Sequence, residues 1–476
     1  MSTSTDIMQV ALSHHQAGRL QQAEQLYRQV LSSDPQNAGA IHLLGLVALQ
    51  AGKPEAAVQL ISTAIRLNGN QPAFHANLGE AFRSLGRLED ARRCYEQVLK
   101  IQPTLPAALN NLGTILQAMG DSAAAIEHYR HALQQQPDYA DAHNNLGIAL
   151  QSLGDQQTAA QAFAKAASID PRYARAHFNR GVALALQQKF DQAVTAFEQA
   201  LAVESNYAEA HYSLGMALQS LGDLSRAENA YHKAMALKPN WAEVASSLGS
   251  LYQAQGDHAR AQQMYEQAVA TNPHYAEAHY NYGTLLKKLG QPEAALEKYR
   301  QAISCKPEFP EAHYNLGTVL QQGGRLEEAA SAYQEAVRLR PDYTLAYNNL
   351  GNVYRDLEKT DEAITCYERA LAIEPASTET QLNLGSAWQE KGQLERTLAC
   401  YEQAMQANPD CAEVFNNLGT ALEELGRYDE ALACFDRSVQ LDPEVGEPHY
   451  NRALLNLSRK QFAEGWADSF FVKPDP

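Results

Sequence analysis

The stretch Ala-Asp-Ala-His-Asn-Asn-Leu-Gly-Ile-Ala-Leu-Gln-Ser-Leu-Gly-Asp, residues 140–155, fits the chain again whenever it is shifted by 34 residues. With residue 140 counted as position 1 of a repeat, position 8 is glycine at residues 45, 79, 113, 147, 181, 215, 249, 283, 317, 351, 385 and 419. Ala11 precedes this series and Ala453 follows it, so the chain holds about fourteen repeats that start at residue 4. Because such a period decides the architecture, every other feature is best described by its position within the repeat.

Each repeat is predicted to be a pair of helices. Apolar residues are spaced by three and four in both halves of the stretch, as in Ala142, Leu146 and Leu150. Gly154 separates the two halves and Pro171 closes the second one. Neither helix can bury its apolar face alone, so the pairs must stack on one another. The sequence therefore predicts an all-α solenoid.

Small and aromatic residues mark the joint between the two helices of a pair. Position 8 is Gly or Ala, and position 20 is Ala in most repeats, as in Ala159 and Ala261. Position 24 is aromatic in most repeats, as in Phe163 and Tyr265. We expect the small residues to let the helices approach closely and the ring to fill the space between them.

This spacing of small, aromatic and proline positions resembles the tetratricopeptide repeat, and the resemblance covers essentially the whole chain. It implies a right-handed α-solenoid of about fourteen 34-residue helix hairpins, in which the first helix of each pair lines a concave groove. The expected organisation is a superhelix of thirteen repeats over 4–445, followed by a degenerate repeat or cap over 446–476.

Asparagine recurs at position 6 and is the main candidate for a binding site. A carboxamide can both donate to and accept from a peptide backbone. First helices of adjacent repeats should lie about 8–10 Å apart, and an extended chain rises about 3.3 Å per residue. One asparagine would then meet about every third residue of a bound segment. The alternative is that these asparagines serve local packing or hydration. We call them the asparagine ladder: Asn77, Asn111, Asn145, Asn179, Asn281, Asn315, Asn349, Asn383, Asn417 and Asn451, interrupted by Ser213 and Ser247.

Three other positions carry recurring polar residues. Glutamine recurs at position 12, as in Gln117 and Gln219, and an acid recurs at position 2, as in Glu209. The acids are explained by the helix macrodipole, or else they make a mildly acidic groove. Histidine recurs at position 4, as in His143 and His211. Because these imidazoles lie one per repeat, they are too far apart to share a metal ion, and we expect them to serve packing.

Composition excludes several functions. The net charge is −17 and no basic stripe is present, which argues against nucleic acid. The first residues lack the pattern of a signal peptide and no apolar run is long enough to span a membrane, so we expect a cytoplasmic protein. The six cysteines are expected to be free thiols. No phosphate loop, nucleophile motif or metal cluster is found, so we predict no enzyme activity, cofactor or metal.

The last repeat ends differently from the others. Phe462, Trp466, Phe470 and Phe471 crowd a helix that has no successor. They are expected either to fold back onto the preceding repeat or to be covered by something else, and one hypothesis is a homodimer through this aromatic helix.

A narrower resemblance concerns the segments Ala124-Ala-Ile-Glu-His-Tyr-Arg-His-Ala-Leu133 and Ala312-His-Tyr-Asn-Leu-Gly317. With the long array and its ladder, they are similar to the repeat arm of O-linked N-acetylglucosamine transferases and SPINDLY-like proteins. Phe462-Ala-Glu-Gly-Trp466 is similar to the last repeat that leads into the catalytic domain of that family. The resemblance implies that the ladder holds an extended substrate protein, but the nucleotide-sugar domain is absent from this sequence.

The sequence therefore favours a non-enzymatic scaffold that binds extended or disordered protein segments in its concave groove. The alternative is a truncated or detached substrate-recognition arm of such a glycosyltransferase, without its catalytic domain.

Overall fold

The computed structural model describes residues 4–459, which form 27 α-helices. The odd-numbered helices are the first helices of the repeats: α1 (Ser4–Gln16), α3 (Ala38–Gln50), α5 (Pro72–Ser84), α7 (Pro106–Ala118), α9 (Ala140–Ser152), α11 (Ala174–Leu186), α13 (Ala208–Ser220), α15 (Ala242–Ala254), α17 (Ala276–Lys288), α19 (Pro310–Gln322), α21 (Thr344–Asp356), α23 (Thr378–Glu390), α25 (Ala412–Glu424) and α27 (Gly446–Ser458). The even-numbered helices are the second helices: α2 (Leu20–Ser33), α4 (Pro54–Leu67), α6 (Leu88–Ile101), α8 (Ser122–Gln135), α10 (Gln156–Ile169), α12 (Phe190–Val203), α14 (Leu224–Leu237), α16 (His258–Thr271), α18 (Pro292–Cys305), α20 (Leu326–Leu339), α22 (Thr360–Ile373), α24 (Leu394–Ala407) and α26 (Tyr428–Leu441).

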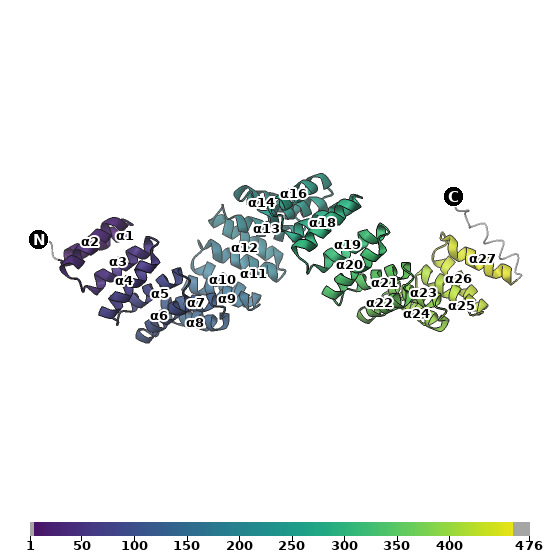
Figure 1. The fold of residues 1–476 in the computed structure, drawn as a ribbon, viewed down its shortest axis with the longest axis horizontal. Helices are drawn as coiled ribbons and strands as arrows, with labels where there is room; N and C mark the ends of the chain where they lie inside the picture. Colours follow the sequence, from purple (N-terminus) through teal and green to yellow (C-terminus); the bar gives the residue numbers. More distant parts are fainter. Residues whose placement is uncertain (1–3, 460–476) are drawn as a thin grey trace. The chain divides into compact units, whose positions relative to one another are not determined.

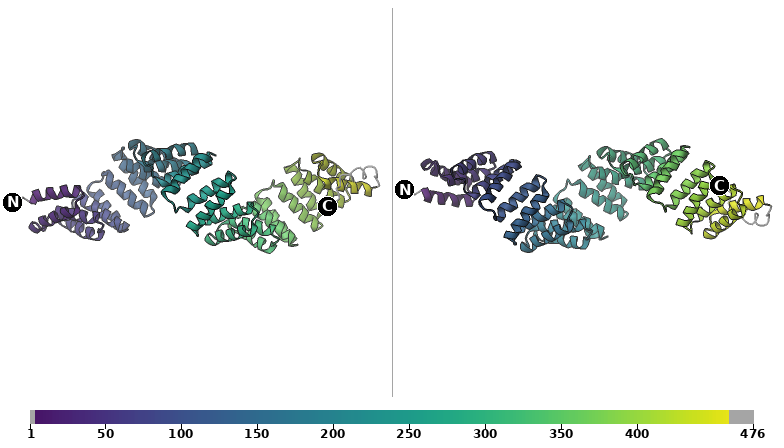
Figure 2. Two further views of the ribbon diagram at one scale, coloured as in Figure 1. Left: turned by 90° about the horizontal axis from the view of Figure 1, so that it is seen from above. Right: turned by 90° about the horizontal axis from the view of Figure 1, so that it is seen from below.

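The chain divides into two compact units, residues 1–239 and 240–476. The first contains α1 to α14 and the second contains α15 to α27. Within each unit, every first helix except α27 packs against the second helix that follows it, and each pair packs against the next pair along the chain. Figures 1 and 2 show these hairpins side by side in chain order. This confirms the prediction of an all-α solenoid of paired helices.

The joint within each hairpin is as tight as the sequence predicts. A Cβ atom added to Gly147 would lie 2.5 Å from the ring of Phe163, and one added to Gly317 would lie 2.8 Å from the ring of Tyr333. The position-24 rings are completely or almost completely buried, and so is Ala261 at position 20. The position-24 ring therefore occupies the space that a side chain at position 8 would need. This explains why the small and aromatic residues recur together.

Local signals set the ends of the second helices. Asp155 caps α10 by accepting a hydrogen bond from the Thr158 backbone N–H at 3.0 Å. Pro292 begins α18, where a missing N–H costs nothing because that group has no partner inside the helix. These residues start each second helix directly after the turn and so fix the angle between the paired helices.

The turn between paired helices requires left-handed backbone. Glycine occupies it in most repeats, as at Gly324 with φ of +70°. Two repeats lack this glycine, and there Gln188 and Glu358 hold φ values of 60° and 58°. A residue with a Cβ atom pays about 1–2 kcal/mol to adopt this conformation. The turn geometry is thus kept by packing even where the residue disfavours it.

We expect Glu358→Gly to raise the free energy of unfolding by about 1 kcal/mol, because glycine removes the Cβ penalty at a positive φ. Urea unfolding followed by circular dichroism measures the change. Glu358→Ala is the matched control, because it removes the carboxylate but keeps the Cβ atom. A gain of the same size in both variants would contradict the explanation.

Candidate functional site

The structure places all ten asparagines of the ladder half-buried on first helices. In four of them the amide nitrogen donates a hydrogen bond to an asparagine of the preceding repeat, 35 residues earlier, at position 5. Each of these four bonds, Asn145 to Asn110, Asn179 to Asn144, Asn383 to Asn348 and Asn451 to Asn416, is 3.0 Å long. In these four repeats the ladder asparagine thus tethers its first helix to the first helix before it.

Other ladder asparagines meet different residues at position 5. The acceptor is the Nε2 atom of His42 for Asn77 (2.9 Å), the Ser246 hydroxyl for Asn281 (3.4 Å), the Tyr280 hydroxyl for Asn315 (2.9 Å) and the Tyr314 hydroxyl for Asn349 (3.1 Å). Asn111 donates instead to the Tyr95 hydroxyl at 3.4 Å. Asn417 follows a repeat with apolar Leu382 at position 5 and makes no side-chain hydrogen bond within residues 4–459.

These contacts leave part of each carboxamide available. One amide hydrogen is used, and in the eight asparagines bonded to position 5 the oxygen accepts no bond from the residues that the structure describes. A buried oxygen without a partner would stand among the unsatisfied buried atoms of the described residues, and none of these eight does. The eight oxygens therefore reach solvent. Each can therefore accept a hydrogen bond from a peptide N–H while the amide still holds the preceding repeat.

Position 5 is the partner that the sequence analysis missed. Asn110, Asn144, Asn348 and Asn416 are buried, which is unusual for asparagine. The signal was present as the repeated Asn-Asn pair, because each of these residues directly precedes a ladder asparagine. Buried polar groups need partners, and the ladder of the next repeat supplies one.

The glutamines at position 12 have a structural partner. In five repeats the hydroxyl of the position-24 tyrosine donates to the glutamine oxygen, as from Tyr231 to Gln219 at 2.7 Å and from Tyr333 to Gln321 at 3.0 Å. Burial raises the pKa of the Tyr333 phenol. Glutamine here satisfies an otherwise buried hydroxyl.

The acids at position 2 are partly neutralised. Glu277 forms an ion pair with Lys306 at 3.1 Å, and Glu209 and Glu311 pair in the same way with Lys238 and Arg340. In two other repeats the acid accepts from the position-5 asparagine, as Glu379 does from Asn348 at 2.9 Å and Glu447 from Asn416 at 3.2 Å. The acids therefore contribute less negative charge to this face than their number suggests.

Each position-4 histidine forms a hydrogen bond to the loop that precedes its own helix. In seven repeats Nε2 lies 2.9–3.2 Å from a backbone carbonyl six residues earlier, as for His143 and Pro137. Burial lowers the pKa of His143, His211 and His279. Over residues 4–459 no group of three or more His, Cys, Asp or Glu is arranged to hold a metal ion.

The cysteines behave as packing residues. Cys94, Cys366 and Cys400 are buried, and burial raises the pKa of their thiols to about 12, 12 and 11. A thiol with such a pKa is not a nucleophile at neutral pH.

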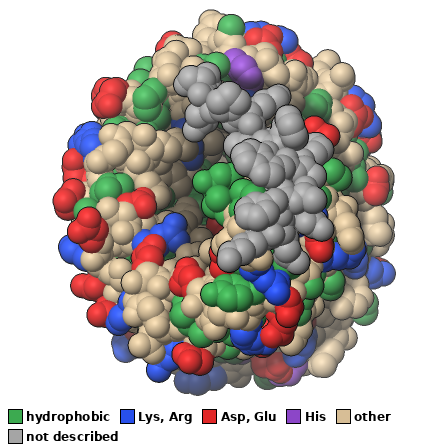
Figure 3. Space-filling model, turned by 90° about the vertical axis from the view of Figure 1, so that its right-hand side faces the viewer, with side chains coloured by type: hydrophobic (Ala, Val, Ile, Leu, Met, Phe, Trp, Pro, Cys, Tyr) green, Lys and Arg blue, Asp and Glu red, His purple; other side chains and the backbone are tan. Residues whose placement is uncertain are grey.

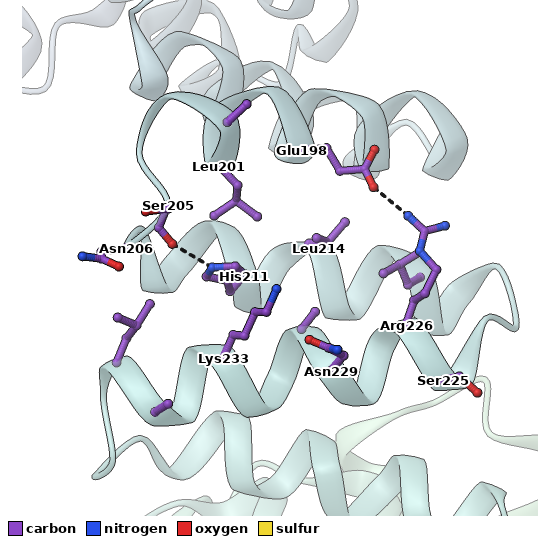
Figure 4. A pocket seen from close by; sticks show the side chains of 15 residues that line it. Glu198, Leu201, Ser205, Asn206, His211, Leu214, Ser225, Arg226, Asn229 and Lys233 are labelled. Carbon is purple, nitrogen blue, oxygen red and sulfur yellow. Dashed lines mark hydrogen bonds and ion pairs between the residues drawn. The ribbon is translucent and has the colours of Figure 1, made fainter.

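A cleft of about 830 Å³ lies between the second helices α12 and α14 and is also lined by the first helix α13 (Figure 4). Leu201, Leu214 and Leu218 supply apolar lining, and the ion pair of Glu198 and Arg226 at 2.6 Å crosses one end. Smaller clefts recur between α18 and α20 and between α22 and α24. The recurrence indicates that these clefts arise from how successive hairpins pack.

Charge is mixed over the part of the surface seen in Figure 3, where basic and acidic side chains alternate. No extended patch of one sign stands out on that face. Among the described helices, none is both long enough and apolar enough to cross a bilayer. The aromatic residues from Phe462 to Phe471, with the homodimer hypothesis that rests on them, lie outside the described residues.

Comparison with known proteins matches tetratricopeptide repeat models along almost the whole chain: residues 14–79, 79–120, 104–172, 183–222, 206–273, 247–307, 309–376, 378–411 and 412–445. No curated protein sequence matches. Among solved structures, the chain is similar to YrrB, described as a TPR protein with an unusual peptide-binding site, at 27% identity over 39% of this chain and 96% of that chain (TM-score 0.34). It is also similar to MamA, at 25% identity over 34% of this chain and 95% of that chain (TM-score 0.33).

A further match is the Cut9–Hcn1 hetero-tetramer of APC/C, at 14% identity over 96% of both chains (TM-score 0.41). None of these findings speaks for a glycosyltransferase arm in particular, so that narrower resemblance stays a hypothesis. The segment Phe462–Trp466, on which it partly depends, lies outside the described residues.

Proposed function

Because the chain belongs to the tetratricopeptide repeat family, we propose that it is a protein-interaction scaffold that holds extended or disordered segments of partner proteins along its first helices. The ladder asparagines are the proposed contacts to the backbone of the bound segment. In this role the chain needs no catalytic residue, since binding itself is the activity.

The observation that carries the proposal is the solvent-accessible carboxamide oxygen of the ladder. Its amide is fixed to the preceding repeat, as from Asn179 to Asn144 at 3.0 Å, so the oxygen is held in place before any ligand arrives. A preorganised acceptor binds at a lower entropy cost than a free side chain. Because peptide N–H groups are the same in every sequence, such contacts favour extended backbone over particular side chains.

The repeat spacing supports the same reading. First helices packed about 8–10 Å apart would present one acceptor for about every three residues of an extended chain. Regular acceptors along successive repeats would hold a long segment through many weak contacts. Affinity would then grow with the length of the bound segment.

The test uses serine, which the chain itself has at two ladder positions, Ser213 and Ser247. A variant with Asn281, Asn315, Asn349 and Asn383 changed to Ser should fold, as circular dichroism would verify. Affinity capture from lysate with mass spectrometry should then recover fewer partners than the native chain does. The matched control changes Gln161, Glu297 and Thr365, all exposed on second helices, to Ser.

The control variant should capture the native set of partners. Equal capture by the ladder variant and the native chain would contradict the proposed contacts. It would turn attention to the clefts between second helices and leave the ladder as a purely structural tether.

A further inference from the structure

Lys287 differs from the other cations at position 12 of the first helices because it has no carboxylate partner among the described residues. Three repeats carry a Lys or Arg at position 12: Arg83, Lys287 and Arg355. Arg83 pairs with Glu80 at 2.6 Å, and Arg355 lies 3.8 Å from Glu390. Within residues 4–459 Lys287 has no carboxylate at ion-pair distance, and its only hydrogen bond is to the Thr318 hydroxyl at 2.9 Å.

The surroundings of Lys287 leave its ammonium partly desolvated. The residue is half-buried at the seam between α17 and α19, because its Nζ atom reaches the first helix of the next repeat. Burial alone lowers the pKa of Lys287, with no charged neighbour contributing. A charge removed from water without a counterion costs free energy, which a bound anion would recover.

The neighbouring side chains carry hydroxyls and amides. Along α17, Thr284 follows Tyr280 by four residues and Lys287 follows Thr284 by three. This spacing puts all three on one face of the helix. The Thr284 hydroxyl accepts from Tyr299 at 3.3 Å, and Tyr280 accepts from the ladder residue Asn315 at 2.9 Å. The Thr318 hydroxyl that the ammonium meets donates in turn to the backbone carbonyl of Asn315 at 2.8 Å, so the ammonium lies next to the ladder.

We propose that Lys287 receives the carboxylate of an aspartate or glutamate of the bound segment, beside the backbone contacts of Asn281 and Asn315. This inference rests on the proposed function and adds a side-chain preference to it. The ladder accepts any extended backbone, whereas the carboxylate fixes where along the array an acidic residue lies. A charge-assisted bond between ammonium and carboxylate would replace the single bond to a neutral hydroxyl.

The chain offers a matched variant for the test. Position 12 is glutamine in six other repeats, so Lys287→Gln removes the charge with a residue that this position accommodates. Lys165→Gln is the control, because Lys165 is exposed on the second helix α10 and its ammonium makes no hydrogen bond or ion pair among the described residues. The probes are two labelled Gly/Ser-rich peptides of equal length, one carrying glutamates and the other glutamines at the same places.

Fluorescence anisotropy should give about tenfold tighter binding of the glutamate peptide by the native chain. This preference should vanish in Lys287→Gln and persist in Lys165→Gln. As a second readout, NMR of ¹³C-methylated lysines should show the pKa of Lys287 rising when the glutamate peptide is added. Equal affinity for both peptides, a preference that survives Lys287→Gln, or no binding of either peptide overturns the inference.

The two proposals fail in different ways. If the glutamine peptide binds and loses affinity in the serine ladder variant, the proposed function stands even when the glutamate preference is absent. If neither peptide responds to the ladder variant while the glutamate preference depends on Lys287, the acidic site stands without the ladder.

Discussion

Tyr333→Ala is expected to lower the free energy of unfolding by about 3–5 kcal/mol. The ring is fully buried and fills the space beside Gly317, where an added Cβ atom would lie 2.8 Å away. Its removal leaves a cavity at the joint of α19 and α20 that the rigid helix backbones cannot close. Because repeats stabilise one another mainly through nearest neighbours, the loss should also weaken the adjoining hairpins. Urea unfolding followed by circular dichroism measures it.

Tyr333→Phe is the matched control, since Phe163, Phe197 and Phe435 occupy this position in other repeats. It keeps the ring and removes only the hydroxyl that donates to Gln321 at 3.0 Å. The expected cost is about 1 kcal/mol. Similar losses in the two variants would mean that the hydroxyl, rather than the ring, holds the joint together.

The second large expected effect is that acid destabilises the seam, the contact between the first helices of the second and third repeats. His42 is buried against Phe74, with ring centroids 4.2 Å apart, and its Nε2 atom accepts from the Asn77 amide at 2.9 Å. Burial lowers the pKa of His42 to about 4. A protonated Nε2 could no longer accept from Asn77, so the folded seam requires the neutral imidazole.

The sign of the pH dependence follows from the difference between the pKa of His42 in the folded chain and in the unfolded one. The pKa of His42 is about 4 in the folded chain and 6.5 in the unfolded one. Above pH 6.5 both states are neutral and no stability is lost. Between pH 6.5 and 4 the unfolded chain takes up a proton that the folded chain refuses, so the free energy of opening this seam should fall by about 3 kcal/mol.

His42→Asn separates this effect from all other titrations. Asparagine holds this position in four other repeats and accepts from the ladder without titrating, as Asn110 does from Asn145 at 3.0 Å. Hydrogen exchange of amides in α3 and α5 at several pH values measures local opening. Relative to the native chain, the variant should gain protection as pH falls. Parallel pH profiles would show that His42 does not titrate between the two states.

The sequence predicts the fold well because the 34-residue period is strict and the Gly-aromatic joint and the closing proline recur in most hairpins. Its predictions were less complete where a contact joins neighbouring repeats. The partner of Asn145 is Asn110, and only the packing of one first helix on the previous one shows this. Periodicity places both residues on their helices but does not say which faces meet.

The same limit explains two other positions. Gln219 is one of the recurring position-12 glutamines, and only the structure shows that it accepts from the hydroxyl of Tyr231 on the second helix of the same hairpin. Lys287 is one of three cations at position 12. Its proposed role as a carboxylate site depends on the absence of a carboxylate near its Nζ atom within residues 4–459, and no sequence pattern reports that distance.

The most direct test of the central claim, that an extended segment lies along the first helices, is photo-crosslinking from consecutive repeats. Lys288, Gln322 and Asp356 are exposed at position 13, seven residues beyond the ladder asparagines and so on the same helix face. A benzophenone amino acid at each site should crosslink one partner segment, with the crosslinked residue shifted by about three residues from one repeat to the next. The control sites Glu297, Ser331 and Thr365, exposed on second helices, should give none of these products. Crosslinks only from the second helices, or contacts without a regular shift, would contradict the account.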